Sequence, residues 1–137
     1  MAAQTQDMVD RLLAATNAHD LEALVGCFAA DYRNETPVHP ARNFTGRDQL
    51  RRNWEQIFGF VPDLHAEITR SAVDGDTAWT EWEMTGTRRD GTPHRMRGIV
   101  IFTVGDGVAQ AARFFLEPVD DGAATVDEAV RAQVVRG

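Results

Sequence analysis

Apolar residues recur at helical spacing along the first sixty residues and at alternate positions after that. Residues 5–16 carry apolar side chains three and four apart, which predicts an amphipathic helix with Thr5 as its N-cap. Residues 17–19 should break this helix, and Asp20 can cap a second, short one. The expected apolar face of the second helix consists of Leu21, Leu24, Val25 and Phe28. The two helices should form a hairpin.

A short strand is expected at residues 31–36, followed by an extended loop and a third helix. The loop contains two prolines, each of which fixes φ and removes a backbone donor. Thr45 and Asp48 resemble a capping pair for the third helix, whose apolar face would carry Leu50 and Trp54. Gly59 and the proline beyond it should end this helix.

From residue 64 onward the pattern changes to four strand-like runs, separated by turn signals at residues 74–75, 89–91 and 105–107. Even-numbered positions in the last three runs are nearly all apolar, so that face needs cover, and the three preceding helices supply it. The sequence therefore predicts an α+β fold, a cone-shaped curved antiparallel β-sheet with three N-terminal helices packed on its inner face. We expect one domain over residues 1–137, with its core at 5–119 and a tail at 120–137. A capping box at residues 125–128 predicts a short helix in the tail, which packs on a neighbour or frays.

The other face of the predicted sheet mixes charged and apolar side chains. Folding the strands about the predicted turns places Glu83 opposite Arg97, Arg97 beside Phe115, and Arg95 near Glu117. Apolar side chains accompany these charges, namely Trp79, Ile99 and Ile101. Such a surface is too apolar for simple solvation, which predicts a homodimer through the outer sheet face, or else contact with a larger partner protein.

Charge and composition exclude several other partners. The formal net charge is -7 and the arginines are scattered among acidic residues, so we expect no nucleic acid to bind. We expect no membrane association and a cytoplasmic location, because no apolar stretch approaches the length of a membrane span and the N-terminus lacks signal-peptide features. The single cysteine, Cys27, lies in an apolar stretch and should be a core residue.

Three segments of the chain stand out as family motifs: NAHDLEALVGCFAADY, FTGRDQLRRNW and ARFFLEPV. They resemble the nuclear transport factor 2-like superfamily, which includes SnoaL-like, ketosteroid isomerase-like and limonene-epoxide hydrolase-like domains, and the resemblance spans residues 5–119. It implies a cone-shaped fold with a small-molecule pocket. The superfold hosts isomerases, hydrolases, dehydratases, cyclases and non-catalytic binders, so the fold alone does not choose among them.

The resemblance also indicates where catalytic groups would stand. Where steroid isomerases carry a tyrosine and an aspartate, this chain carries Leu12 and Thr36, neither of which can perform their proton transfer. The Y-x-N pair that holds a water in limonene-epoxide hydrolases is present as Tyr32 and Asn34. The carboxylates and arginine that activate this water are missing, and apolar residues take their places: Trp82, Met84 and Phe114.

Candidate catalytic residues gather near the first strand and its loop. Tyr32 and Asn34 alternate onto one face with Thr36, where they would either contact a ligand or satisfy one another as a polar plug. His39 lies in the following loop, and its ordinary pKa of about 6.5 suits a general acid or base. The expected apolar lining consists of Trp54, Trp82, Met84, Met96, Phe102 and Phe114, with Gly98 leaving room for a ligand.

Two functions remain open at this stage. The first is an enzyme that isomerises, cyclises, dehydrates or opens an apolar oxygenated metabolite, with His39 moving the proton. The second is a ligand-binding or dimerisation module without catalysis, because the usual cavity carboxylates are missing. We expect no metal, since the histidines show no metal-ligand spacing, and the resemblance implies no cofactor.

Overall fold

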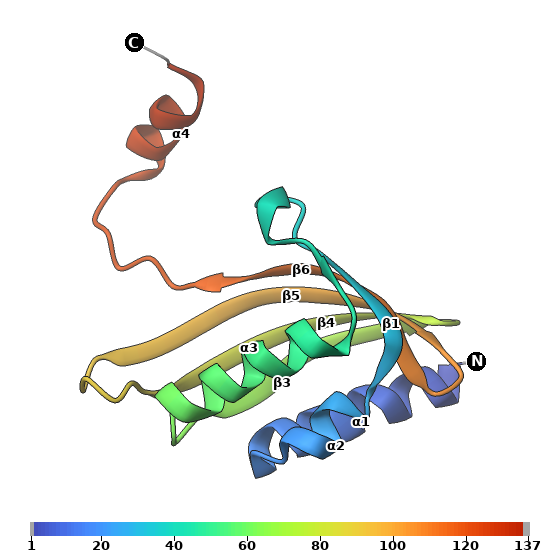
Figure 1. Ribbon diagram of the computed structural model, residues 1–137. Helices are drawn as coiled ribbons and strands as arrows, with labels where there is room; N and C mark the ends of the chain where they lie inside the picture. The colour runs from blue at the N-terminus through green and yellow to red at the C-terminus, as the bar shows by residue number, and fades with distance from the viewer. Residues whose placement is uncertain (1, 136–137) are drawn as a thin grey trace.

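The computed structural model describes residues 2–135, and its centre is a curved six-stranded sheet with helices on the concave side (Figure 1). The chain begins with α1 (Ala2–Ala18), α2 (Leu21–Val25), β1 (Phe28–Glu35), the 3-10 turn η1 (Pro40–Arg42), β2 (Phe44–Thr45) and α3 (Arg47–Phe60). It continues with β3 (His65–Asp74), β4 (Thr77–Thr87), β5 (Pro93–Gly105), β6 (Val108–Pro118) and α4 (Val126–Val134). The α+β fold with helices on one face of a curved sheet is as predicted, and β2 is an additional short strand.

The first helix begins earlier than predicted. It starts at Ala2, so Thr5 lies inside the helix rather than at its cap. The Thr5 side chain is fully buried and its Oγ1 donates a hydrogen bond to the carbonyl of Gly75, 2.8 Å away. The threonine thus anchors α1 to the turn between β3 and β4, and the predicted cap was wrong.

The break after α1 and the cap of α2 are as predicted. His19 has a φ of 53°, which ends α1, and the Asp20 carboxylate accepts a hydrogen bond from the amide of Ala23 at 3.0 Å. Asn17 exchanges two hydrogen bonds with the backbone of Ala66, which ties the end of α1 to β3. The second helix is shorter than predicted, because Phe28 already belongs to β1.

The start of α3 also differs from the prediction. Thr45 pairs with Arg33 in the sheet, and the N-cap residue is Gly46. Its φ of 95° is a conformation that glycine adopts readily, and no side chain caps the helix at this position. Gly59 lies within the helix, which runs to Phe60. The guanidinium of Arg47 donates two hydrogen bonds to the Phe28 carbonyl, at 2.8 and 2.6 Å, and so ties the start of α3 to the start of β1.

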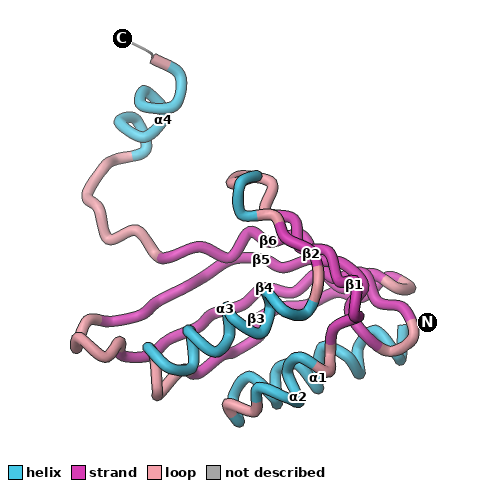
Figure 2. Tube along the Cα trace, in the orientation of Figure 1, coloured by secondary structure: helices cyan, strands magenta, loops and turns pink. Residues whose placement is uncertain are grey.

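The sheet has the strand order β2-β1-β6-β5-β4-β3 (Figure 2). The three predicted turns connect β3 to β6 as an antiparallel meander. The first strand lies beside β6 and runs parallel to it, so the sheet is mixed rather than wholly antiparallel. This arrangement brings the loop after β1 close to the end of β6, which matters for the site described below.

A bulge at Gln110 sets the register of β6. Val104 pairs with Ala109 while Thr103 pairs with Ala111, so Gln110 has no partner across the ladder. The extra residue keeps the apolar even-numbered side chains of β6 on the concave face. It also shifts the cross-strand neighbours: Arg97 stands opposite Glu117 and not beside Phe115. The predicted neighbours of Arg97 in β6 were therefore wrong by two residues.

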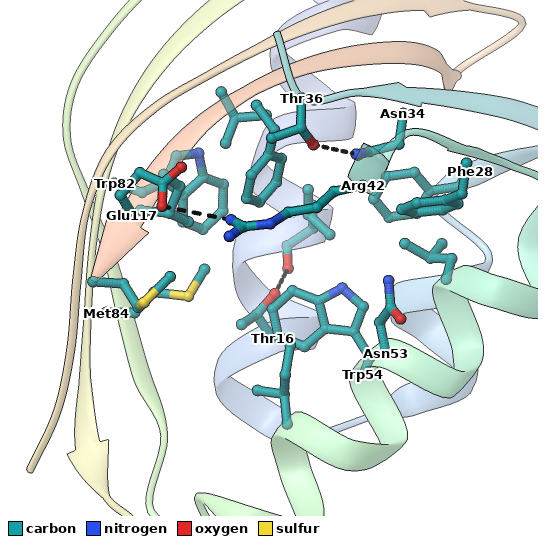
Figure 3. A pocket seen from close by; sticks show the side chains of 18 of the residues that line it. Thr16, Phe28, Asn34, Thr36, Arg42, Asn53, Trp54, Trp82, Met84 and Glu117 are labelled. Atoms are coloured by element: carbon teal, nitrogen blue, oxygen red, sulfur yellow. Dashed lines mark hydrogen bonds and ion pairs between the residues drawn. The ribbon is translucent and has the colours of Figure 1, made fainter. Parts of the chain in front are cut away.

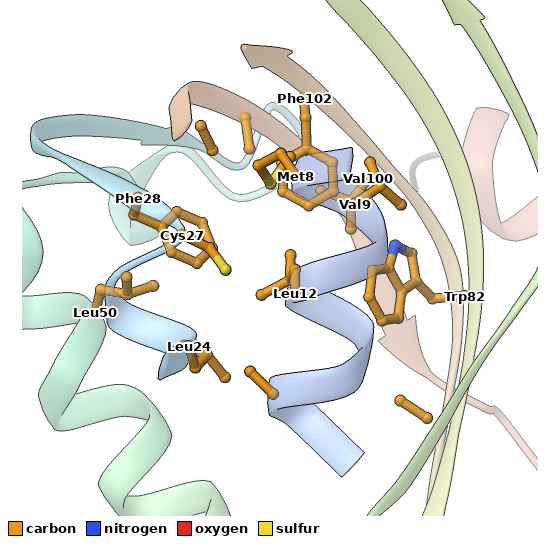
Figure 4. Close-up of a cluster of buried hydrophobic side chains, with 14 of the residues drawn as sticks. Met8, Val9, Leu12, Leu24, Cys27, Phe28, Leu50, Trp82, Val100 and Phe102 are labelled. Carbon is orange, nitrogen blue, oxygen red and sulfur yellow. The ribbon is translucent and has the colours of Figure 1, made fainter. Parts of the chain in front are cut away.

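The core fills the space between α1, α2 and the concave face of the sheet (Figure 4). Met8 and Leu24 are fully buried, and Val100 is 2% exposed. Cys27 is buried among them and its Sγ lies 3.4 Å from the Ala23 carbonyl. Burial raises the pKa of the Cys27 thiol, which suits the predicted role of a core residue.

The tail leaves the sheet after Pro118 and carries α4 away from the domain (Figure 1). Thr125 caps this helix, since its side chain accepts a hydrogen bond from the Glu128 amide at 3.3 Å. The predicted cap at Thr125 is therefore present, as one half of the expected capping box. The valines on α4 are exposed, with Val126 at 78%. None of the helices within residues 2–135 combines the length and apolar character that crossing a membrane requires.

Candidate functional site

A pocket of about 500 Å³ opens between α1, α3, β1 and the concave face of the sheet (Figure 3). Most of its wall is apolar. The sequence-predicted residues that line it are Tyr32, Asn34, Thr36, Trp54, Trp82, Met84, Met96, Phe102 and Phe114. Two predicted site residues, His39 and Gly98, do not line it.

Gly98 serves the sheet rather than the pocket. A Cβ atom at this position would lie 2.1 Å from the carbonyl oxygen of Phe115 and 2.7 Å from the Cα of Leu116. The backbones of β5 and β6 therefore approach each other too closely here for any side chain. The expectation that Gly98 leaves room for a ligand is replaced by this requirement of strand packing.

Three polar residues of β1 and its end form a hydrogen-bonded chain at one wall of the pocket. The Tyr32 hydroxyl donates to Asn34 Oδ1 at 2.7 Å, and the Asn34 amide donates to Thr36 Oγ1 at 3.4 Å. The three side chains lie on one face because alternate residues of a strand point the same way. Asn43 Oδ1 accepts from the Thr36 backbone amide at 2.6 Å and fixes the end of the strand.

The environment of Tyr32 keeps its hydroxyl neutral. The residue is 2% exposed and packs edge-on against Phe28 and Phe44. Burial raises the pKa of the Tyr32 phenol far above its ordinary value, because a phenolate would lose its hydration. Tyr32 is therefore a hydrogen-bond donor at neutral pH and not a base.

Trp82 forms part of the pocket wall on the side of the sheet, and its indole N–H is not available to a ligand. Its indole Nε1 donates to Thr80 Oγ1 at 2.7 Å, and the Thr80 hydroxyl donates to the carbonyl of Val100 at 2.7 Å. Both hydrogen-bonding groups are thus satisfied within the sheet. The Trp82 ring offers the pocket an apolar surface.

The helix α3 adds two amides that the sequence reasoning missed. Asn53 and Gln56 line the pocket beside Trp54. Asn53 Oδ1 accepts a hydrogen bond from Gln49 Nε2 at 2.7 Å, one turn earlier in the helix. The i, i+3 spacing of Asn53 and Gln56, flanking Trp54, is a signal that could have placed both on the pocket side.

A charged cluster stands beside the pocket, where the loop after β1 meets the end of β6. Glu117 lines the pocket together with Arg42, and Arg42 Nη1 lies 3.8 Å from Glu117 Oε2 (Figure 3). His39 Nε2 lies 3.0 Å from Glu117 Oε1. We refer to His39, Arg42 and Glu117 as the mouth cluster. Sequence reasoning placed Glu117 near Arg95, but Arg95 pairs with Asp121 instead, at 3.6 Å.

A comparison of the sequence with models of protein families identifies the family of this chain. Residues 9–114 match the model of the SnoaL-like domain. This chain belongs to the SnoaL-like family. A search of curated proteins finds no match to the chain.

Solved structures similar to this SnoaL-like protein share its fold at low sequence identity. A candidate ketosteroid isomerase from Kribbella flavida has 23% identity and a TM-score of 0.70, over 99% of this chain and 90% of that one. A candidate SnoaL-like polyketide cyclase from Jannaschia has 19% identity and a TM-score of 0.71, over 84% and 86%. A protein with a ketosteroid isomerase-like fold from Catenulispora acidiphila, in complex with trimethylamine, has 18% identity and a TM-score of 0.68, over 92% and 94%.

The donor set of this SnoaL-like protein does not resemble a metal site. Within residues 2–135, no group of three or more histidine, cysteine, aspartate or glutamate side chains could hold a metal ion. The polar groups that line the pocket are hydroxyls and amides, with Arg42 and Glu117 added at its edge. This set can bind a ligand oxygen through hydrogen bonds and can exchange a proton with it.

Proposed function

We propose that this SnoaL-like protein binds an apolar, oxygenated small molecule in its pocket and acts on it as a cofactor-independent isomerase, cyclase, dehydratase or epoxide hydrolase. The observation that supports this proposal is the composition of the pocket. Large apolar walls enclose about 500 Å³, and hydrogen-bonding side chains gather along β1. Pockets that combine an apolar wall with a few convergent polar groups are typical of small-molecule sites.

The polar residues of β1 would bind the oxygen of the ligand. The contact between Asn34 Nδ2 and Thr36 Oγ1 is long, at 3.4 Å, and so lies at the weak end of hydrogen bonding. A ligand oxygen can replace it at little cost. Tyr32 donates to Asn34 Oδ1, which holds the amide with its nitrogen toward Thr36. Proton transfer would fall to the mouth cluster, in which His39 Nε2 lies 3.0 Å from Glu117 Oε1.

The relatives' names are compatible with this range of reactions. One similar structure carries the name of a ketosteroid isomerase and another that of a polyketide cyclase. Their sequence identities to this chain lie below the level at which function transfers with the fold. The reaction therefore has to be argued from the pocket and tested on it.

A specific observation also favours a second function, ligand binding without catalysis. The inward sheet positions 82, 84 and 114 carry apolar side chains, where the resemblance to limonene-epoxide hydrolases implies charged ones. A protein that binds its ligand only through the apolar wall and the β1 amide would need none of those charges. Catalysis and binding thus differ in whether any ligand is converted.

Turnover and binding can be measured together. Nile red, a neutral apolar dye, reports binding by its fluorescence, and a panel of lactones, epoxides and enones reports turnover. Met96→Trp should fill the pocket and abolish dye binding, while Thr103→Trp, on the exposed face of the same strand, should not. No dye binding by the unmodified protein would contradict the proposal. Dye binding without turnover of any panel member would favour the binding function.

We further propose that two copies associate through the outer face of the sheet. Trp79 is 51% and Ile99 is 40% exposed there, next to the Glu83–Arg97 ion pair at 3.0 Å. An apolar surface of this kind is stabilised when a second copy covers it. Ile99→Arg should convert a dimer to a monomer in light scattering. A monomer before the substitution would contradict the proposal.

A further inference from the structure

Glu117 differs from the other charged residues of the sheet in what it faces. Of the described residues that line the pocket, Glu117 alone carries a carboxylate. Glu83 pairs with Arg97 on the outer face, and Glu35 is 3.8 Å from Arg113 with more than half of its side chain exposed. The pocket thus has one carboxylate within reach of a ligand.

The three residues of the mouth cluster are not equivalent in position. His39 Nε2 is directed at Glu117 Oε1, 3.0 Å away, and His39 itself does not line the pocket. Glu117 therefore lies between the pocket and the imidazole of His39. A proton on the ligand would meet Glu117 before it could meet His39.

The two oxygens of Glu117 are engaged differently. Oε1 is held by His39, while the 3.8 Å between Oε2 and Arg42 Nη1 exceeds hydrogen-bond length. The lone pairs of Oε2 therefore remain available to accept a proton. His39 and Arg42 both come from the loop 37–43, so this loop holds Oε1 through His39 and places a cation 3.8 Å from Oε2.

We propose that Glu117 is the catalytic base of the pocket, with His39 and Arg42 as positioning residues, and that the substrate is an apolar carbon acid. The inference rests on the proposed function, which it narrows to reactions that begin with removal of a proton from carbon. In such a step the ligand C–H bond breaks, the proton moves to Glu117 Oε2, and the electron pair passes into the ligand. Isomerisation returns the proton at another carbon, and elimination expels a leaving group. Glu117 is 39% exposed, so water can take the proton away in the second case.

The base can be tested without the natural substrate by using nitrobenzisoxazole. This apolar bicyclic probe loses its ring C–H proton to a base, its N–O bond breaks, and a coloured nitrile-bearing phenolate forms. The unmodified protein should convert the probe faster than acetate does at the same carboxylate concentration. Glu117→Gln should lower kcat about a hundredfold or more with little change in KM, since general-base catalysis contributes at least that factor.

Matched variants separate the base from the structure around it. Glu117→Asp keeps a carboxylate and should retain part of the rate. Glu83→Gln removes a carboxylate that also pairs with an arginine, but on the outer face, and should leave the rate unchanged. Arg42→Gln should lower kcat more than it raises KM, and Arg42→Lys should recover part of the loss. Nile red fluorescence establishes in each variant that the pocket is intact.

The outcomes distinguish this inference from the function on which it rests. If the unmodified protein binds Nile red but is no faster than acetate, or if Glu117→Gln keeps the full rate, Glu117 is not the base and the binding proposal survives. If the unmodified protein binds no Nile red, the proposed function and the inference fail together. A rate loss that is large in Glu117→Gln, smaller in Glu117→Asp and the Arg42 variants, and absent in Glu83→Gln would support the inference.

Discussion

The pocket carries two polar clusters that differ in burial and in charge. The β1 cluster, Tyr32, Asn34 and Thr36, is neutral, and none of its residues is more than 8% exposed. The mouth cluster, His39, Arg42 and Glu117, consists of ionisable side chains that are 37–61% exposed. One cluster belongs to the wall of the fold, and the other lies on a loop and a strand end.

The difference in burial and charge separates two tasks in this pocket, stabilising the fold and exchanging protons with a ligand. Buried hydroxyls and amides must be hydrogen-bonded, so the β1 cluster contributes to stability whether or not a ligand is present. Exposed charges gain little from one another in water, so the mouth cluster contributes little to folding. The comparison teaches that residues which stabilise this pocket and residues which can exchange protons in it are different residues.

The largest effect on stability should come from the β1 cluster. Asn34→Leu removes the acceptor of the Tyr32 hydroxyl and leaves that donor buried without a partner. We expect the free energy of unfolding to fall by about 2–3 kcal/mol, the cost of an unsatisfied buried polar group. The shift of the urea midpoint measures this loss.

A double substitution checks whether the hydrogen bond is the cause. Tyr32→Phe combined with Asn34→Leu removes both partners, so no donor is left unsatisfied, and part of the lost stability should return. If the double variant loses as much free energy of unfolding as the two single variants lose together, the hydrogen bond between Tyr32 and Asn34 is not the cause.

The second largest effect should appear in alkaline solution. Burial raises the pKa of Tyr32 above its ordinary value of about 10, so the folded state keeps its proton where the unfolded chain has lost it. The stability from this group is complete below about pH 10 and is lost as the pH rises through the folded pKa. Tyr32 is the only tyrosine of the chain, so tyrosinate absorbance reports on it alone.

In the folded protein this absorbance should appear only as the chain unfolds. The same titration in urea should give a midpoint near the ordinary value. A folded protein, judged by circular dichroism, whose tyrosine titrates at its ordinary pKa would show that the β1 cluster is open to water.

The fold could be predicted because its signals are local. Turn residues at 74–75, 89–91 and 105–107 and the alternation of apolar residues between them define the four-stranded meander. The bulge at Gln110 was missed, because nothing in the sequence marks which residue is left unpaired. The parallel contact of β1 with β6 is also a long-range pairing that periodicity cannot show.

The site was predictable in its interior and not at its edge. Tyr32, Asn34 and Thr36 alternate along one strand, so their shared face follows from strand geometry. Glu117 meets His39 and Arg42 only because the loop after β1 reaches the end of β6. Contacts between a loop and a strand that are far apart in the sequence carry no periodic signal, and the carboxylate nearest to His39 was therefore missed.

The smallest effect on stability should come from the mouth cluster. Glu117→Gln and Arg42→Gln should each lower the free energy of unfolding by less than about 1 kcal/mol, since exposed ion pairs contribute little and salt screens them. Urea midpoints at low and high salt measure this, with Asn34→Leu as the reference. If Arg42→Gln cost as much stability as Asn34→Leu, the loop would be a structural part of the domain. A small loss in both variants would leave the mouth cluster free to serve proton transfer, because its charges would not be needed to hold the chain folded.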